Sequence, residues 1–112
     1  GSACINTAGE KVYPEEVEEV LKLHPAVLDA NVVGLPDERW GQSVTAVVSL
    51  VDGSDEVGEG DLIAHTKEHL AGYKCPKRVV LVDQVQRGPN GKPDHRWAAR
   101  VAADALAGPG SR

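Results

Sequence analysis

Three short segments rich in valine, residues 27–33, 44–50 and 79–82, limit the folds that this chain can adopt. β-Branched side chains favour extended backbone, so each segment predicts a β-strand. Phe and Met are absent from the 112 residues, so valine, leucine, isoleucine and alanine must fill the core. A core of these side chains favours a thin two-layer body over a thick sandwich. We therefore expect one small α+β domain, a sheet of about three strands packed with helices.

The segment from Pro14 to Leu23 predicts the first helix. Proline is tolerated in a first helical turn, and Glu15 and Glu16 follow it beside the positive end of the helix dipole. The helix should end before Pro25, because the residue before a proline is biased out of the α region.

Two further helices are expected: one at residues 62–70 with Asp61 as the cap, and a last one that Asp94 caps and that runs to about residue 106. The glycine- and proline-containing stretch 34–41 predicts a long loop between the first two strands. Those two strands should pair antiparallel, whereas the third, reached through a helix, could pair parallel to one of them.

Charge and cysteine usage exclude several classes of protein. The chain has 17 acidic residues against 12 Lys and Arg, a net charge of −5, which argues against a nucleic-acid-binding protein. Cys4 and Cys75 form no C-x-x-C pair, so a disulfide framework is unsupported. No apolar run approaches the ~20 residues of a membrane span. These features predict a soluble, cytoplasmic protein.

The segment Gly88-Pro89-Asn90-Gly91-Lys92-Pro93 is the strongest candidate for chemistry. Glycine, proline and asparagine are typical of tight turns, and Lys92 follows at the exit. A lysine held this way can bring a compact positive charge to oxygens that become negative during acyl or phosphoryl transfer. The segment is not a Walker A loop, which would require Ser or Thr at Pro93. Spacing alone favours the alternative, an ordinary turn with a solvated lysine.

Three other segments could bind a ligand. The loop 7–11 could donate backbone hydrogen bonds, although it could equally be a plain lead-in to the first helix. Trp40, beside a glycine, could stack on a ligand or cover the core. Tyr73 precedes a basic run that includes Lys77 and could meet phosphates, although such runs are more often solvated edges.

His65 and His69 have the i, i+4 spacing of a zinc chelate. No glutamate follows His65 as the H-E-x-x-H motif demands, and no cysteine cluster supplies further ligands. We expect two surface histidines and no metal site.

Together these segments resemble the C-terminal domain of the adenylate-forming (AMP-binding) superfamily, in particular of acyl-CoA and aryl-CoA synthetases. The residues that carry the resemblance occur in the family's order and at its intervals: 7–18, 24–27, 33–37, 40–42, 73–77 and 90–92. Each segment is weak evidence alone, and the ordered set covers nearly the whole chain.

The resemblance implies a role in a two-step ligase reaction. A carboxylate first attacks the α-phosphate of ATP to give an acyl-adenylate, and CoA then displaces AMP. It implies that Lys92 bridges carboxylate and phosphate oxygens in the first step. After a domain rotation, Ala8, Gly9 and Glu10 would line the pantetheine tunnel. ATP and CoA would be substrates, and Mg²⁺ would arrive with ATP without being ligated by this domain.

The same resemblance places Trp40 and Tyr73 beside the CoA adenine or pantetheine arm and Lys77 at the CoA phosphates. It also implies a domain plan: a hinge-proximal segment at 1–6 (which could include part of a tag), the lid domain at 7–106 and a disordered tail at 107–112. The partner would be a larger N-terminal domain of the same chain, which holds the carboxylic acid. The fragment alone should therefore be inactive.

The chain departs from the family pattern at three positions. Ala8 stands where the family usually has the first of two glycines, which could narrow the tunnel. Cys75 stands where some CoA ligases have an arginine, which puts a phosphate contact in doubt. Ser2 stands at the hinge, where the family has Asp or Lys, so no hinge residue is assigned.

Two alternatives belong to other classes. The G-x-x-G of Gly88 to Gly91 also occurs in KH-type RNA-binding modules, but there it joins two helices. A non-catalytic docking domain would explain an exposed Trp40 and an acidic first helix, but not the ordered set of family-like segments.

Overall fold

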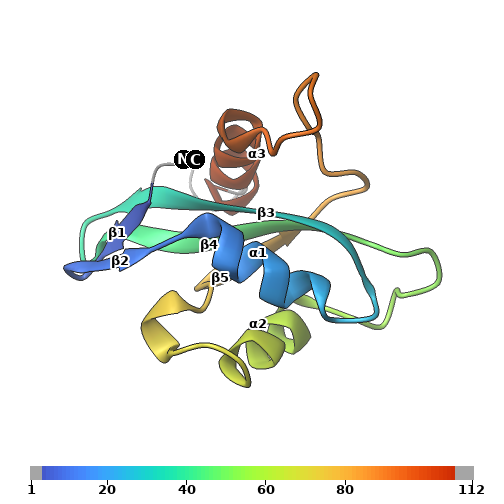
Figure 1. The fold of residues 1–112 in the computed structure, drawn as a ribbon, viewed down its shortest axis with the longest axis horizontal. Helices are drawn as coiled ribbons and strands as arrows, with labels where there is room; N and C mark the ends of the chain where they lie inside the picture. The colour runs from blue at the N-terminus through green and yellow to red at the C-terminus, as the bar shows by residue number, and fades with distance from the viewer. Residues whose placement is uncertain (1–3, 108–112) are drawn as a thin grey trace.

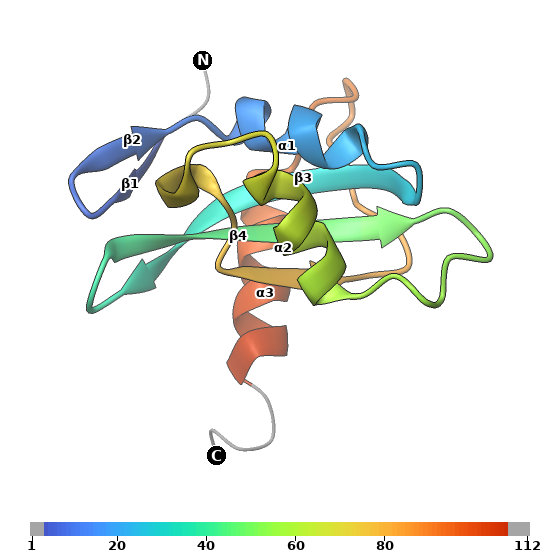
Figure 2. The same ribbon diagram turned by 90° about the horizontal axis from the view of Figure 1, so that it is seen from below.

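A computed structural model describes residues 4–107 and reveals one mixed sheet with helices on both of its faces (Figures 1 and 2). The elements in chain order are β1 (Ile5–Thr7), β2 (Glu10–Val12), α1 (Pro14–Lys22), β3 (Val27–Asp37), β4 (Gly41–Leu50), α2 (Glu59–Lys67), the 3₁₀ turn η1 (Gly72–Lys74), β5 (Arg78–Leu81) and α3 (His95–Ala107).

The long antiparallel pair β3–β4 is the centre of the sheet. It extends from Val27 opposite Leu50 to Asp37 opposite Gly41, with a register shift between Val27 and Asp29 and regular pairing from Asp29 opposite Ser49 onward. β5 pairs with β4 in parallel. β1 pairs with β4 and also with β2, so that β2 lies at the edge of the sheet. The α+β class, the antiparallel central pair and the parallel third strand are confirmed.

Two details of the predicted sheet need correction. The sheet has five strands instead of about three, because residues 5–12 form a short hairpin whose three-residue strands are too brief to show a pattern. The expected loop 34–41 is mostly strand: β3 continues to Asp37 and only residues 38–40 form the turn.

Helices lie on both faces of the sheet, which adds a layer to the expected two. On one face, Val32 and Val48 pack in a cluster with side chains of α1 and α2, including Leu21 and Leu62. On the other face, α3 packs its own apolar side chains against the sheet (Figure 1). The continuous valine runs of β3 and β4 explain this, because strands buried on both faces lose the alternation of polar and apolar residues.

Two aspartates were expected to cap helices, and one of them does so. The Asp94 carboxylate accepts a hydrogen bond from the Trp97 N–H at 3.0 Å, which confirms its capping role on α3. Asp61 is not the N-cap of α2: it lies in the first turn, where its carboxylate accepts the Gly58 N–H at 2.8 Å.

Ser2 and residues 108–112 lie outside the described residues, and Ala107 is the last residue of α3. Within residues 4–107, no helix has both the length and the apolar character needed to cross a bilayer.

Candidate functional site

Lys92 lies in a closed turn between β5 and α3. The Gly88 N–H donates to the Lys92 carbonyl at 2.8 Å, and the Gly91 N–H donates to the Gly88 carbonyl at 3.0 Å. Gly91 has a φ of 80°, a conformation that favours glycine, and Arg87 pairs with Pro93 across the base of the turn. The backbone on both sides of Lys92 is therefore held by hydrogen bonds.

The Lys92 side chain is exposed, and no carboxylate of residues 4–107 forms an ion pair with it. Its ammonium group is therefore available to a partner that approaches from outside the domain. The arrangement can bring one positive charge to a reaction centre on another body, and the turn contains no second titratable group.

A second group of predicted residues meets at the β1–β2 hairpin. Ala8 and Gly9, with φ of 51° and 82°, form its two-residue turn. The Ala8 N–H donates to the Trp40 carbonyl at 2.8 Å, and the ammonium of Lys77 lies 4.6 Å from the centre of the Trp40 ring. The structure thus brings together Ala8, Trp40 and Lys77 from three distant parts of the sequence. Ala8 carries a Cβ in a conformation that glycine adopts more easily, which adds a physical reason for a glycine at this position.

Tyr73 and Glu10 lie on η1 and β2, at the same end of the molecule (Figure 2). Tyr73 is 40% exposed on η1, and the Lys74 ammonium lies 5.9 Å from its ring centre. Lys74 itself pairs with Glu16 at 2.9 Å. Glu10 is exposed at the start of β2. We call Ala8, Gly9, Glu10, Trp40, Tyr73 and Lys77 the hairpin-end group.

The Lys92 turn and the hairpin-end group lie apart. In both views the β1–β2 hairpin and η1 lie toward one end of the domain, whereas the segment that leads to α3 projects away from them (Figures 1 and 2). The Lys92 turn and the hairpin-end group therefore do not form one compact site within the described part of the chain (Figures 1 and 2).

Glu18 is a buried acid that the sequence analysis missed. It is 4% exposed, and its carboxylate accepts the Val32 N–H at 2.8 Å and pairs with His95 Nε2 at 3.1 Å. Burial raises the pKa of Glu18 above its ordinary value, against the opposing effect of these two hydrogen bonds. Its position on the stripe of Pro14, Val17 and Leu21 could have revealed it.

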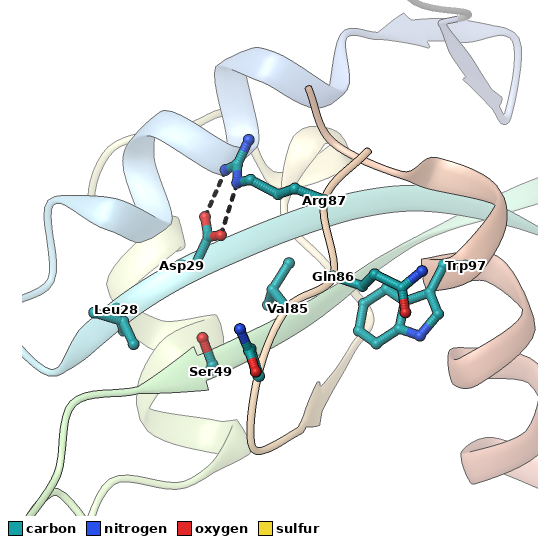
Figure 3. Close-up of a pocket in the computed structure, with 8 residues that line it drawn as sticks. Leu28, Asp29, Ser49, Val85, Gln86, Arg87 and Trp97 are labelled. Atoms are coloured by element: carbon teal, nitrogen blue, oxygen red, sulfur yellow. Dashed lines mark hydrogen bonds and ion pairs between the residues drawn. The ribbon is translucent and has the colours of Figure 1, made fainter. Parts of the chain in front are cut away.

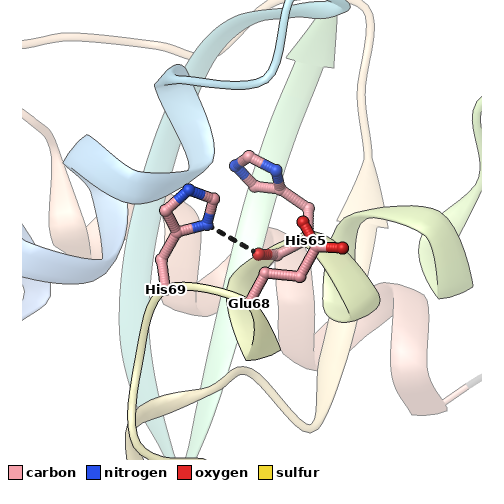
Figure 4. A group of neighbouring side chains, drawn as sticks. All are labelled: His65, Glu68 and His69. Carbon is pink, nitrogen blue, oxygen red and sulfur yellow. Dashed lines mark hydrogen bonds between the residues drawn. The ribbon is translucent and has the colours of Figure 1, made fainter.

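His65, Glu68 and His69 lie close together at the end of α2 (Figure 4). Carbonyl oxygens can only accept, so His65 Nε2 donates to Val20 at 2.7 Å and His69 Nδ1 donates to His65 at 3.0 Å. The His65 bond ties α2 to α1. Each ring therefore has a structural contact, and we assign the cluster to helix packing.

The turn that holds Lys92 does not have the setting of a KH loop, because it leads into α3 from the irregular segment after β5 and not from another helix. Cys75 is buried, and its thiol faces the carbonyls of Leu70 and Ala71. It therefore cannot offer the surface contact that an arginine could make at this position.

Comparison with known proteins identifies the family of this chain. The model of the AMP-binding enzyme C-terminal domain matches residues 16–92. A 3-oxocholest-4-en-26-oate–CoA ligase of Rhodococcus rhodochrous is 57% identical over 88% of this chain and 18% of its own length. The medium-chain acyl-CoA ligase Mig of Mycobacterium avium is 52% identical over 92% of this chain and 18% of its own length.

Solved structures give the same result. Apo MatB from Rhodopseudomonas palustris superposes with a TM-score of 0.85 at 31% identity, over 94% of this chain and 21% of that one. A fatty acyl CoA synthetase of Mycobacterium tuberculosis superposes with a TM-score of 0.82 at 34% identity, over 91% of this chain and 20% of that one. The chain thus spans about a fifth of these proteins, and it belongs to the AMP-binding enzyme C-terminal domain family.

Proposed function

We propose that this chain is the C-terminal lid of an AMP-forming acyl-CoA synthetase, in which Lys92 serves acyl-adenylate formation and the hairpin-end group serves thioester formation. The observation that carries the proposal is the exposed Lys92 ammonium on a turn closed by hydrogen bonds. The relatives are named as CoA ligases, and the chain covers about a fifth of their length.

In the first step, the Lys92 ammonium would contact oxygens of the carboxylate and of the α-phosphate of ATP. Negative charge is redistributed over these oxygens as the carboxylate attacks. A fixed cation there stabilises the transition state more than the separated substrates, which is the requirement for catalysis. Mg²⁺ would enter with ATP, and this domain would not ligate it.

In the second step, the hairpin-end group would contact CoA. The Trp40 ring and the Tyr73 ring offer flat apolar surfaces for adenine or pantetheine, and Lys77 offers a positive charge for phosphate. The turn Ala8-Gly9 exposes backbone close to Trp40. Because this group and Lys92 lie apart, one lid could serve the two steps in two orientations.

The larger N-terminal domain would hold ATP and the acid, so the chain alone should form no acyl-CoA. The relatives named for fatty acids and for a steroid carboxylate support an apolar carboxylic acid as the first substrate to test.

The experiment joins this chain to the N-terminal domain, either covalently or in trans, and measures the two steps separately. Lys92→Ala should lower adenylate formation by about 10²–10³-fold, while thioester formation from a supplied acyl-adenylate changes little. Lys67→Ala, which removes another exposed lysine on α2, is the matched control and should change neither step. Equal adenylation rates in Lys92→Ala and Lys67→Ala, or acyl-CoA formation by the chain alone, would refute the proposal.

A further inference from the structure

Two polar residues of β3 hold the two ends of the segment that carries Lys92. Asp29 and Asn31 are two positions apart on the strand, so their side chains project from the same face of the sheet. Val33, two positions further on, packs against α3, which identifies this face as the one that α3 covers. Asp29 binds the start of the segment and Asn31 binds its end.

Arg87 joins Asp29 to the turn. Its Nη2 and Nε donate to the two Asp29 carboxylate oxygens at 2.6 and 2.9 Å (Figure 3). Its Nη1 donates to the Gly91 carbonyl at 3.0 Å. A guanidinium is planar and rigid, so three hydrogen bonds from one side chain fix the direction of the turn as well as its position. The Gly91 carbonyl belongs to the peptide group that precedes Lys92.

Asn31 holds the other end. Its Nδ2 donates to the Asp94 carbonyl at 3.0 Å, two residues after Lys92, and Asp94 is the cap of α3. The side chain is fully buried, and its Oδ1 accepts no hydrogen bond from any residue in 4–107. A buried amide whose oxygen has no partner contributes little to the stability of the fold. The structure therefore indicates a different role for Asn31, which is to hold Asp94 through this hydrogen bond.

We propose that Asp29, Arg87 and Asn31 are positioning residues for Lys92: they fix the turn so that the ammonium reaches the reacting oxygens without a search through many backbone conformations. The inference rests on the proposed role of Lys92. Catalysis by a single charge depends steeply on its placement, and a displacement of about 1 Å can cost roughly a hundredfold in rate.

The charge on Asp29 agrees with this geometry. Burial acts to raise the pKa of Asp29, but the hydrogen bonds from Arg87 and Ala30 and the charges of Arg87 and Lys22 outweigh it, so the pKa lies below its ordinary value. The carboxylate therefore stays ionised and keeps both bonds to Arg87 at neutral pH.

The first test measures the turn directly in this chain, by amide hydrogen exchange and ¹⁵N relaxation. Asp29→Asn should speed exchange of the Gly88 amide by about tenfold or more and raise the mobility of residues 88–92, because Arg87 loses its charged acceptor. Arg87→Lys, which keeps the charge but loses the planar fork, should do the same.

The matched control is Glu59→Gln. Glu59 also accepts hydrogen bonds from an arginine, Arg78, and from a backbone N–H, that of Val79, each at 2.8 Å. Its loss should leave exchange at Gly88 unchanged. The proposal is overturned if Asp29→Asn leaves the turn as protected as in the wild type, or if Glu59→Gln loosens it equally.

The second test measures adenylation in the complete enzyme. Asp29→Asn and Arg87→Lys should lower kcat for adenylate formation by roughly tenfold to a hundredfold with little change in the KM for ATP, while thioester formation from supplied acyl-adenylate is retained. If Lys92→Ala slows adenylation and these variants do not, the positioning role is wrong. If Lys92→Ala has no effect, the proposed function is wrong. The exchange data then still decide whether Asp29 and Arg87 hold the turn.

Discussion

The ammonium of Lys77 lies 4.6 Å from the centre of the Trp40 ring, and the Arg39 guanidinium lies 5.0 Å from it. The side chains come from different strand ends, and the Ala8 N–H adds a third contact to the Trp40 carbonyl at 2.8 Å. Cation–π contact of this kind orients an otherwise mobile lysine and keeps the indole in place. Lys77 and Arg39 thus place two positive charges beside the half-buried Trp40 ring.

We expect Lys77→Ala to raise the KM for CoA in thioester formation by roughly tenfold, because a hydrogen bond to a charged group contributes about 1.5–3 kcal/mol. Adenylate formation should be unchanged, since the residue lies apart from Lys92. Steady-state kinetics of the complete enzyme with CoA and with dephospho-CoA make the measurement. A smaller effect of the variant on dephospho-CoA than on CoA identifies a contact with the 3′-phosphate, and equal effects exclude it.

The buried acid predicts a pH dependence of stability. The pKa of Glu18 in the folded chain is raised above 4.5, so the native state holds this proton more tightly than the unfolded state does. The contribution of Glu18 to stability should therefore fall as pH rises from 4.5 through the raised pKa, and level off above it.

Glu18→Gln should remove this contribution, because the amide cannot ionise. Urea unfolding of the wild type and the variant at several pH values from 4 to 8 gives the difference in unfolding free energy. The unfolding free energy of Glu18→Gln relative to that of the wild type should increase as pH rises from 4.5 through the raised pKa of Glu18. A difference that is constant with pH, or that shifts the other way, contradicts the assignment.

The sequence predicts the parts of this domain that local chemistry decides. The proline and acids at 14–16 mark the start of α1, the glycines and asparagine at 88–91 mark the Lys92 turn, and Asp94 marks the start of α3. Each of these depends on residues within a few positions of one another. The position of the turn in the chain was therefore readable without any structure.

The rest depends on contacts between distant residues. Arg87 meets Asp29 across 58 positions, and Ala8 meets Trp40 across a sheet whose short first strands show no pattern of their own. The third layer was missed because the absence of Phe and Met favours two layers, whereas α3 packs small alanines, together with Trp97, against the sheet. Pairing and layering of this kind are set by tertiary packing, which no local pattern encodes.

The packing of α3 on the sheet gives a test of that layer. Ala98 and Ala102 are fully buried against Val33 and Val47. We expect Ala102→Leu to lower the unfolding free energy by about 1–3 kcal/mol, since a full site has no room for added methylenes. Ala103→Leu, one position away on the exposed side of the helix, should stay within about 0.5 kcal/mol of the wild type. Urea unfolding measures the unfolding free energy of both variants. Equal losses of unfolding free energy would mean that α3 turns a different side toward the sheet.

The backbone conformation of Gly91 predicts that replacing glycine by alanine lowers the unfolding free energy in the Lys92 turn, whereas the same replacement at Gly60 raises it. Gly91 has a φ of 80°, where a Cβ crowds the carbonyl of its own chain neighbourhood, so Gly91→Ala should cost about 1–2 kcal/mol of unfolding free energy. No atom beyond the two adjacent residues lies within 4 Å of the added carbon, so the cost comes from the backbone conformation alone. Gly60 lies in α2 with equally open space around it and no positive φ. Gly60→Ala should therefore stabilise the chain by about 0.5–1 kcal/mol, because alanine loses less backbone entropy in a helix. Urea unfolding of the two variants measures both signs. Equal stabilisation by both would mean that residue 91 leaves the left-handed region in solution, and the Lys92 backbone would then lack the fixed geometry that its proposed role requires.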